Sequence, residues 1–316
     1  MIFIIIIAIL SINTQSLISG DNPRWIRKII IVRENNFANS LSFLNNFRFS
    51  TKDAVIFEDI IFKTGDPLNL CSVYESERIL REREFLANVK IDLSPAGDDS
   101  VDVIISFAEK WSTSINFSYR KQGDYHNYGL TFKDVNLLGL GYNASLSFAL
   151  LNEGMSREFI FFDKNLFGSR YDLKLQDKLY PEWSIKTIHL HRKFYSLKSN
   201  REISLYYQKF NGQKYLASGV SYENVIVTNT LFEFLISLGT LNKVIHFDSS
   251  QALSNRSVLK IRYYIDRDKG KGYQKTSEML NAGFYIWSLS YFKSRYFNLS
   301  IDYEDVQLGH FIGFSA

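Results

Sequence analysis

From Thr113 onward, hydrophobic and polar residues alternate along the chain, which predicts β-strands with one apolar and one polar face. In the first such run, Ile115, Phe117 and Tyr119 share one face, and the residues between them are polar. We expect roughly ten to twelve strands of about ten residues each, joined by polar turns. The clearest later runs are residues 142–150, 171–176, 259–266 and 297–304.

Before Trp111 the pattern is mixed and predicts a small α+β unit. Residues 25–32 are expected to form a strand, and residues 89–93 and 101–107 two more strands separated by a loop of turn-forming residues. Residues 50–53, Ser-Thr-Lys-Asp, resemble a capping box with Asp in place of Glu. The helix that they would open is expected to carry Ala54, Val55, Phe57, Ile61 and Phe62. Any small α+β domain fits this order of elements.

A second, amphipathic helix is expected just after Asn69, whose side chain can cap it. Its apolar positions keep a helical period at Leu70, Val73, Ile79 and Leu80. Its charged positions are expected to face water; they are Glu75, Glu77, Arg78, Arg81 and Glu82.

Two architectures fit the alternating region, because a soluble β-sandwich alternates as a membrane barrel does. Three features favour the barrel: a candidate export signal, strands that recur to the end of the chain, and aromatic residues on the apolar face or near strand ends. A closed barrel also satisfies every backbone group inside lipid. The predicted fold class is therefore mainly β, a complete or incomplete membrane β-barrel preceded by a small α+β domain, with a soluble β domain as the alternative.

The composition changes this picture little. The 316 residues are 46% hydrophobic and 22% charged, which is ordinary for a folded protein, and the net charge of +4 is too small to indicate nucleic-acid binding. Only four Pro interrupt the chain, and Phe and Tyr are abundant, which favours strands. Cys71 is the single cysteine, so an intrachain disulfide is excluded.

The N-terminus begins with an apolar run followed by small and polar residues, as in a secretory signal peptide, although basic residues are missing from its start. We expect residues 1–20 to be this signal. A buried strand or an uncleaved anchor is the alternative.

Several separated motifs resemble a known family. Residues 51–56, 61–67, 75–81, 101–103 and 109–112 are similar to a POTRA module, in particular the last module of BamA/TamA-type outer-membrane proteins of the bacterial surface antigen superfamily. Residues 136–141, Asn-Leu-Leu-Gly-Leu-Gly, resemble a turn of that family's first barrel strands, as do residues 162–171 and 194–197. The resemblance covers roughly residues 25–200.

The resemblance implies a POTRA-like periplasmic domain at residues 21–111 and an outer-membrane barrel at residues 112–316. It also implies a non-enzyme without cofactors, which inserts or translocates other proteins at the bacterial outer membrane. The implied partners are outer-membrane lipid, unfolded client proteins or peptides in the periplasm, and accessory assembly proteins, with no nucleic acid. A passive pore or structural surface antigen is the alternative.

The chain departs from the family in three respects. The family's barrel is implied to have about sixteen strands, its inward loop carries an Arg-Gly-Phe-type motif that is absent here, and its last strand is expected to end on an aromatic residue, whereas this chain ends at Ala316. We expect either a chain truncated at its C-terminal end, which would be nonfunctional, or a shorter member of the family.

Three groups of candidate site residues follow from the resemblance together with the alternation. The edge that would receive a client strand carries Val89, Ile91 and Leu93, and the strand that would act as a barrel gate carries Ser114, Asn116 and Ser118. The motif turns are marked by Asn136, Gly139, Gly141, Asp163, Asn165, Gly168 and Arg170.

Other motifs favour no catalytic or metal chemistry. Gly139, Gly141 and Ala144 match a dinucleotide-binding fingerprint, but a strand pattern follows where that fingerprint needs a helix. His189 and His191 would share one strand face, yet a third ligand is missing at a readable spacing, so polar residues of the barrel interior are the favoured interpretation. Cys71 is expected to be a small apolar filler.

Overall fold

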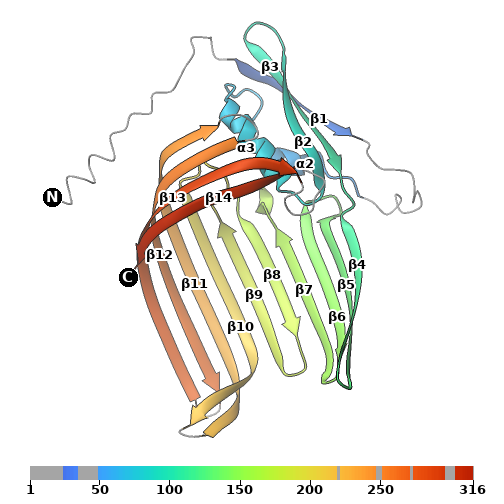
Figure 1. Cartoon of the computed structure of the whole chain (residues 1–316), viewed down its shortest axis with the longest axis vertical. Coiled ribbons are helices and arrows are strands. Elements are labelled where there is room, and N and C mark those ends of the chain that lie inside the picture. Colours follow the sequence, from blue (N-terminus) through green and yellow to red (C-terminus); the bar gives the residue numbers. More distant parts are fainter. Residues whose placement is uncertain are drawn as a thin grey trace, which may run out of the picture.

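The computed structural model describes residues 24–34, 49–218, 221–246, 251–270, 273–295 and 303–315. The expected signal peptide lies outside these residues, and so does most of the alternating run 297–304. The described chain folds into a small mixed module followed by a large antiparallel sheet (Figure 1). No helix in this described part is long and apolar enough to cross a bilayer.

The module is a three-stranded sheet covered by two helices. Its strand order is β1-β3-β2, in which β1 runs parallel to β3 and β2 antiparallel to it. The elements are β1 (Trp25–Glu34), α2 (Asp53–Asp59), α3 (Leu70–Arg81), β2 (Leu86–Pro95) and β3 (Ser100–Glu109). The helices and the inner faces of the strands enclose an apolar core that includes Ile56, Leu80, Val103, Ile105 and Phe107.

The order strand, helix, helix, strand, strand is confirmed, with one correction to α2. No side-chain hydrogen bond caps α2 at Lys52, so the predicted capping box does not form. The helix ends at Asp59, which leaves Ile61 and Phe62 beyond it. By contrast, Asn69 caps α3 as expected, since its side chain accepts a hydrogen bond from the Ser72 amide.

The large sheet has eleven described strands, β4 to β14, each paired with its neighbours in chain order. Its first six strands are β4 (Thr113–Gln122), β5 (Tyr125–Leu137), β6 (Tyr142–Leu151), β7 (Gly154–Asp163), β8 (Asp172–Leu179) and β9 (Trp183–Arg192). The other five are β10 (Arg201–Ser218), β11 (Ser221–His246), β12 (Gln251–Gly270), β13 (Tyr273–Arg295) and β14 (Tyr303–Ser315).

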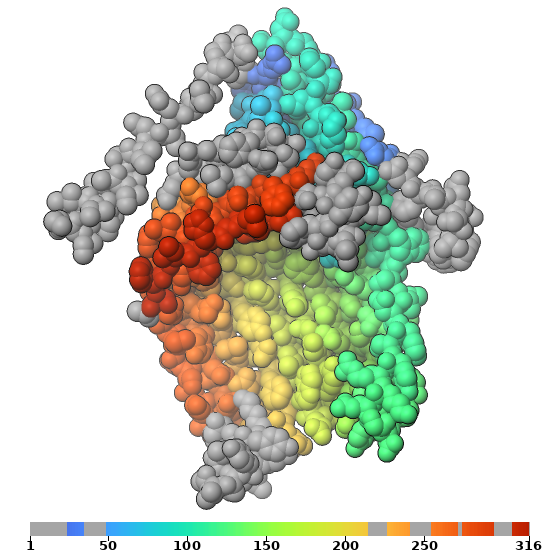
Figure 2. All heavy atoms as spheres, in the orientation of Figure 1, coloured from blue at the N-terminus to red at the C-terminus, as the bar shows by residue number. Residues whose placement is uncertain are grey.

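The sheet curls strongly but does not close among the described residues. In Figure 1 the last two strands, in orange-red and red, pass in front of the middle of the sheet, and Figure 2 shows them crossing beneath the module. β4 pairs with β5 and β14 with β13, and no pairing joins β4 to β14 in the described ranges. The described sheet is therefore an open, barrel-like wall with β4 and β14 as its edges.

The two faces of this wall have the reverse of a soluble protein's polarity. On β11, Leu238 is 54% exposed while the adjacent Ser237 is fully buried, and on β9, Ile188 is 50% exposed while Thr187 is 6% exposed. Many of the exposed side chains are large and apolar, and most of the buried ones that the wall contains are polar or charged, such as Thr187, Ser204, Asn229, Ser254 and Arg256. A soluble sandwich would bury the apolar face under a second sheet. No such cover lies over it in the described residues, so the barrel prediction holds over the sandwich.

Candidate functional site

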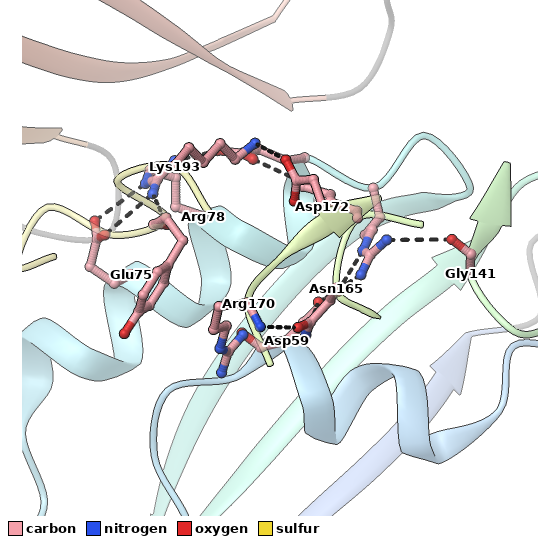
Figure 3. Close-up of polar contacts among 12 residues, drawn as sticks. Asp59, Glu75, Arg78, Gly141, Asn165, Arg170, Asp172 and Lys193 are labelled. Atoms are coloured by element: carbon pink, nitrogen blue, oxygen red, sulfur yellow. Dashed lines mark hydrogen bonds and ion pairs between the residues drawn. The ribbon is translucent and has the colours of Figure 1, made fainter. Parts of the chain in front are cut away.

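The candidate site is the junction where the module sits on three turns of the large sheet. These turns join β5 to β6, β7 to β8 and β9 to β10, and they meet α2 and α3 through buried polar contacts (Figure 3). The second turn contains a short 3-10 segment, η2 (Leu166–Gly168). All three turns contain residues that resemble family motifs, 136–141, 162–171 and 194–197, and the candidate site residues of the motif turns lie in the first two.

The first turn is organised by Asn136, which is buried. Its backbone amide donates to Asp134 Oδ1 at 2.8 Å, and its Oδ1 accepts from the Gly141 amide at 2.8 Å, so the side chain closes the turn. Its Nδ2 donates to the hydroxyl of Thr51 at 2.9 Å, just ahead of α2. One asparagine thus both shapes the turn and ties it to the start of α2.

The second turn repeats this arrangement around Asn165. Its backbone amide donates to Asp163 Oδ1 at 3.0 Å, and its Oδ1 accepts from the Arg170 amide at 2.8 Å. Its Nδ2 donates to the carbonyl oxygen of Glu58 at 2.8 Å, at the last turn of α2. The two Asp-x-Asn turns therefore hold α2 at its two ends.

Glycine is required where the first turn meets the module. Gly139 has a φ of 72°, and its carbonyl oxygen accepts from the Lys52 amide at 2.9 Å. A Cβ at this position would lie 2.1 Å from the Ser50 carbonyl oxygen, well inside contact distance. The left-handed backbone and the close approach both exclude a larger residue here.

A buried ion pair lies beside the second turn. Arg83, which follows α3, binds Asp59 through two hydrogen bonds of 2.5 and 2.7 Å, and both side chains are buried. Burial acts to lower the pKa of Arg83, but the charge and hydrogen bonds of Asp59 outweigh it and raise that pKa. Arg170 donates to the carbonyl oxygens of Asp59 and Ile60 at 3.0 and 2.6 Å, so three elements meet at this point.

The third turn is held by Glu75 and Arg78 of α3. The expectation that the charges of α3 face water was wrong for Glu75, Glu77, Arg78 and Arg81, and it is confirmed for Glu82, which is exposed. Glu75 is fully buried, Glu77 is 2% exposed and Arg78 is 7% exposed. Glu75 Oε2 accepts from the Leu197 amide at 2.9 Å and also pairs with Arg78. Most of the polar face of α3 is buried because the large sheet supplies partners for its charges.

From inside the wall, Arg256 of β12 supports the same turn. Its guanidinium donates to the carbonyl oxygens of Leu197 and Ser199 at 2.8 and 2.9 Å, and it stacks on the ring of Phe194 at 4.4 Å. The sequence indicated neither Arg256 nor the charges of α3 as site residues, because their partners lie far away in the chain.

The candidate client-strand edge lies on β2, which is an edge strand of the module sheet. Val89 and Ile91 turn their side chains into the core, where they are 3% and 8% exposed, and Leu93 is half-buried. The Ile91 amide already donates to Glu77 Oε2 at 3.2 Å. The candidate gate residues Ser114, Asn116 and Ser118 lie on β4, where every residue is exposed.

The two histidines lie together inside the wall. The His189 and His191 rings stack at 5.3 Å; His191 Nε2 is 3.0 Å from Glu202 Oε1, and His189 Nε2 is 2.9 Å from the Ser204 hydroxyl. No group of three or more potential metal ligands occurs in the described residues. Cys71 has a free thiol and is half-buried on α3.

Comparison with known proteins gives distant structural similarity. No protein-family model matches the chain, and no curated protein matches its sequence. Among solved structures, the chain is similar to BamA from Haemophilus ducreyi lacking POTRA domains 1–3, with a TM-score of 0.44, 13% identity, and coverage of 94% of this chain and 85% of that one.

Two further solved structures are CdiB proteins. For CdiB from Acinetobacter baumannii the TM-score is 0.37 and the identity 12%, over 91% of this chain and 46% of that chain. For CdiB from Escherichia coli the values are 0.33 and 10%, over 96% and 67%. The chain therefore spans about half the length of the Acinetobacter protein.

Proposed function

We propose that this chain is a bacterial outer-membrane protein of the BamA/TamA type, which inserts or translocates other proteins. In this proposal the large sheet forms a lipid-facing wall, and the module lies in the periplasm and receives unfolded clients. The chain acts without a cofactor and is not an enzyme. Its partners are outer-membrane lipid, unfolded proteins or peptides, and accessory assembly proteins.

The reversed polarity of the large sheet carries this proposal. Side chains such as Phe117, Phe148 and Leu259 are 72%, 37% and 46% exposed on one face, and an antiparallel wall can leave such a face uncovered only against lipid. The module is fixed to one end of the wall through buried polar contacts. This end would then face the periplasm, where unfolded clients are present.

Two strand edges could receive a client by main-chain hydrogen bonding. β2 lies at the edge of the module sheet, and β4 lies at the edge of the described large sheet. An edge strand carries unpaired amide and carbonyl groups that can bind an added strand. We propose that clients first bind at β2, beside Val89, Ile91 and Leu93, and that β4, with Ser114, Asn116 and Ser118, pairs with them later.

Reconstitution of the full chain into outer-membrane lipid vesicles tests this function. An unfolded barrel protein would be added as client, and its folding followed by protection from protease and by heat-resistant electrophoretic mobility. The proposal requires faster client folding with this chain than with empty vesicles. An equal rate would reject it.

A passive pore is the second candidate, because polar and charged side chains line the inner face of the wall, among them Glu202 and His191. Conductance across a planar bilayer measures this directly. Solute-selective conductance together with an unchanged rate of client folding would favour the pore over the assembly function.

A further inference from the structure

A network of buried charges joins α3 to β2 and to the last two strands. Glu77 accepts from the Ile91 amide of β2 at 3.2 Å and from Lys293 Nζ of β13 at 3.2 Å. Arg81, which also pairs with Glu77, donates to the carboxylate of Asp305 on β14 at 2.7 and 2.9 Å. We call Glu77, Arg81, Lys293 and Asp305 the clasp.

The members of the clasp depend on one another. The side chains of Glu77 and Arg81 are each 3% exposed, Asp305 is 9% exposed and Lys293 is 16% exposed. Charges this deeply buried are stable only with their partners in place, because water no longer solvates them. Displacing the Glu77 carboxylate would therefore weaken the attachment of Lys293, and through Arg81 that of Asp305.

The clasp also occupies the candidate client edge. The Ile91 amide donates to Glu77 and so points away from β3. Because amide directions alternate along the regularly paired residues 90–95, the Leu93 amide points the same way. A strand added along this edge needs the Ile91 amide, which is the first outward amide of the regularly paired part of β2. It can bind there only if Glu77 leaves.

We propose that Glu77 couples the two events: a client strand that adds to β2 displaces the Glu77 carboxylate and releases β13 and β14 from α3. This regulation rests on the proposed function, since it takes β2 as the entry edge. Figure 1 shows the last two strands passing beside α3, where release would let them move away from the module. An empty edge keeps these strands attached, and an occupied edge frees them.

The test uses the full chain in lipid vesicles with two reporters. Val306, which is 5% exposed on β14 beside Asp305, is replaced by Cys in a Cys71→Ser background, and its rate of maleimide labelling reports release. A photo-crosslinking amino acid replaces Lys90, an exposed residue of β2, to report occupancy. The probe is a synthetic peptide with the sequence of residues 142–151, which alternates like a barrel strand.

The peptide is expected to crosslink at position 90 and to raise the labelling rate at position 306 at least about tenfold, since a buried thiol becomes accessible. Asp305→Asn and Lys293→Gln are expected to raise that rate without peptide. The control is Lys275→Gln, at an exposed lysine of β13, the strand that also carries Lys293. It should change neither the crosslinking at position 90 nor the labelling rate at position 306. A peptide carrying Pro at alternate positions should neither crosslink at position 90 nor raise the labelling rate at position 306, because proline lacks the backbone N–H that pairs with the edge strand.

The outcomes separate the coupling from the proposed function. Crosslinking with an unchanged labelling rate would overturn the coupling and leave β2 as the entry edge. If the peptide crosslinks at position 90 neither in the wild type nor in Asp305→Asn, β2 is not the entry edge. The proposal that clients first bind at β2 then fails. Unchanged labelling in both clasp variants would show that the clasp does not hold the last strands.

Discussion

Apolar and polar residues alternate along the strands of both the module and the large sheet, but the apolar face is buried in the module and exposed in the large sheet. In β3 of the module, Val103, Ile105 and Phe107 all face inward and are fully buried. In β11 of the large sheet, the apolar Leu238 is 54% exposed, and its neighbour Ser237 is fully buried. Alternation with a period of two residues thus identifies a strand in both regions. It leaves open whether the apolar face packs in a protein core or contacts membrane lipid.

The largest effect should come from emptying the module core. Phe107→Ala removes a fully buried ring, and is expected to lower the free energy of unfolding by about 3–5 kcal/mol. Phe117→Ala on β4 removes a ring that is 72% exposed, and should cost less than about 1 kcal/mol, because lipid replaces the lost contacts. Urea unfolding in vesicles measures both. Equal costs would mean that Phe117 is packed in a core.

A charge on the outer face sharpens the comparison from the side of the large sheet. Ile188, which is 50% exposed, lies in the middle of β9. Ile188→Lys is expected to destabilise the chain in vesicles by about 2–4 kcal/mol if this face meets acyl chains. The control Asp124→Lys lies in the exposed turn between β4 and β5 and should be neutral. A neutral Ile188→Lys would indicate that water covers the face.

The junction between the two regions should respond less strongly. Asn165→Ala leaves the Arg170 amide and the Glu58 carbonyl oxygen without this partner, and the expected cost is about 1–3 kcal/mol. Asn116→Ala, at an exposed position of β4, should be nearly neutral. Protease accessibility of the module reports detachment from the turns. An unchanged digestion pattern in Asn165→Ala and in the double variant with Asn136→Ala would contradict the two-ended attachment of α2.

The smallest effect concerns pH. Burial acts to raise the pKa of Glu82, but the charges of Lys164 and Arg78 outweigh it and set that pKa to about 2. The pKa of Glu in an unfolded chain is about 4.3. The lowered pKa of Glu82 therefore stabilises the folded chain above this pH, and the stabilisation is lost as the pH falls toward 2. Glu82 is about a third exposed, with 35% relative side-chain accessibility, so solvent screens the pair.

The variant Glu82→Gln tests this pH dependence. Its free energy of unfolding should fall less than that of the wild type between about pH 5 and pH 2, because the titrating carboxylate is gone. Parallel curves for the two proteins over this range would show that Glu82 contributes nothing.

The sequence predicted elements better than it predicted their surroundings. The three module strands, strands β4, β6, β8 and β12 of the large sheet, and the Asn69 cap follow from local patterns, whereas β5, β7, β10, β11 and β13 gave no clear run of their own. The turns around Asn136 and Asn165 were found through their resemblance to family motifs. The burial of Glu75, Glu77 and Arg78 could not be predicted, because their partners Leu197, Lys293 and Tyr195 lie far along the chain. An amphipathic pattern shows which helix face is polar, but a second domain can bury that face.

Spin-label accessibility at two adjacent residues of β11 tests the reversed polarity most directly. Phe232 is 39% exposed on the outer face, and Glu233 points to the inner face. Each is replaced by a labelled Cys in the Cys71→Ser background, and the chain is reconstituted in vesicles. If the apolar face meets lipid, oxygen, which concentrates in acyl chains, should relax the spin label at position 232, and a water-soluble nickel complex should relax the label at position 233. The opposite pattern, or protection of position 232 from both reagents, would contradict a wall that faces lipid.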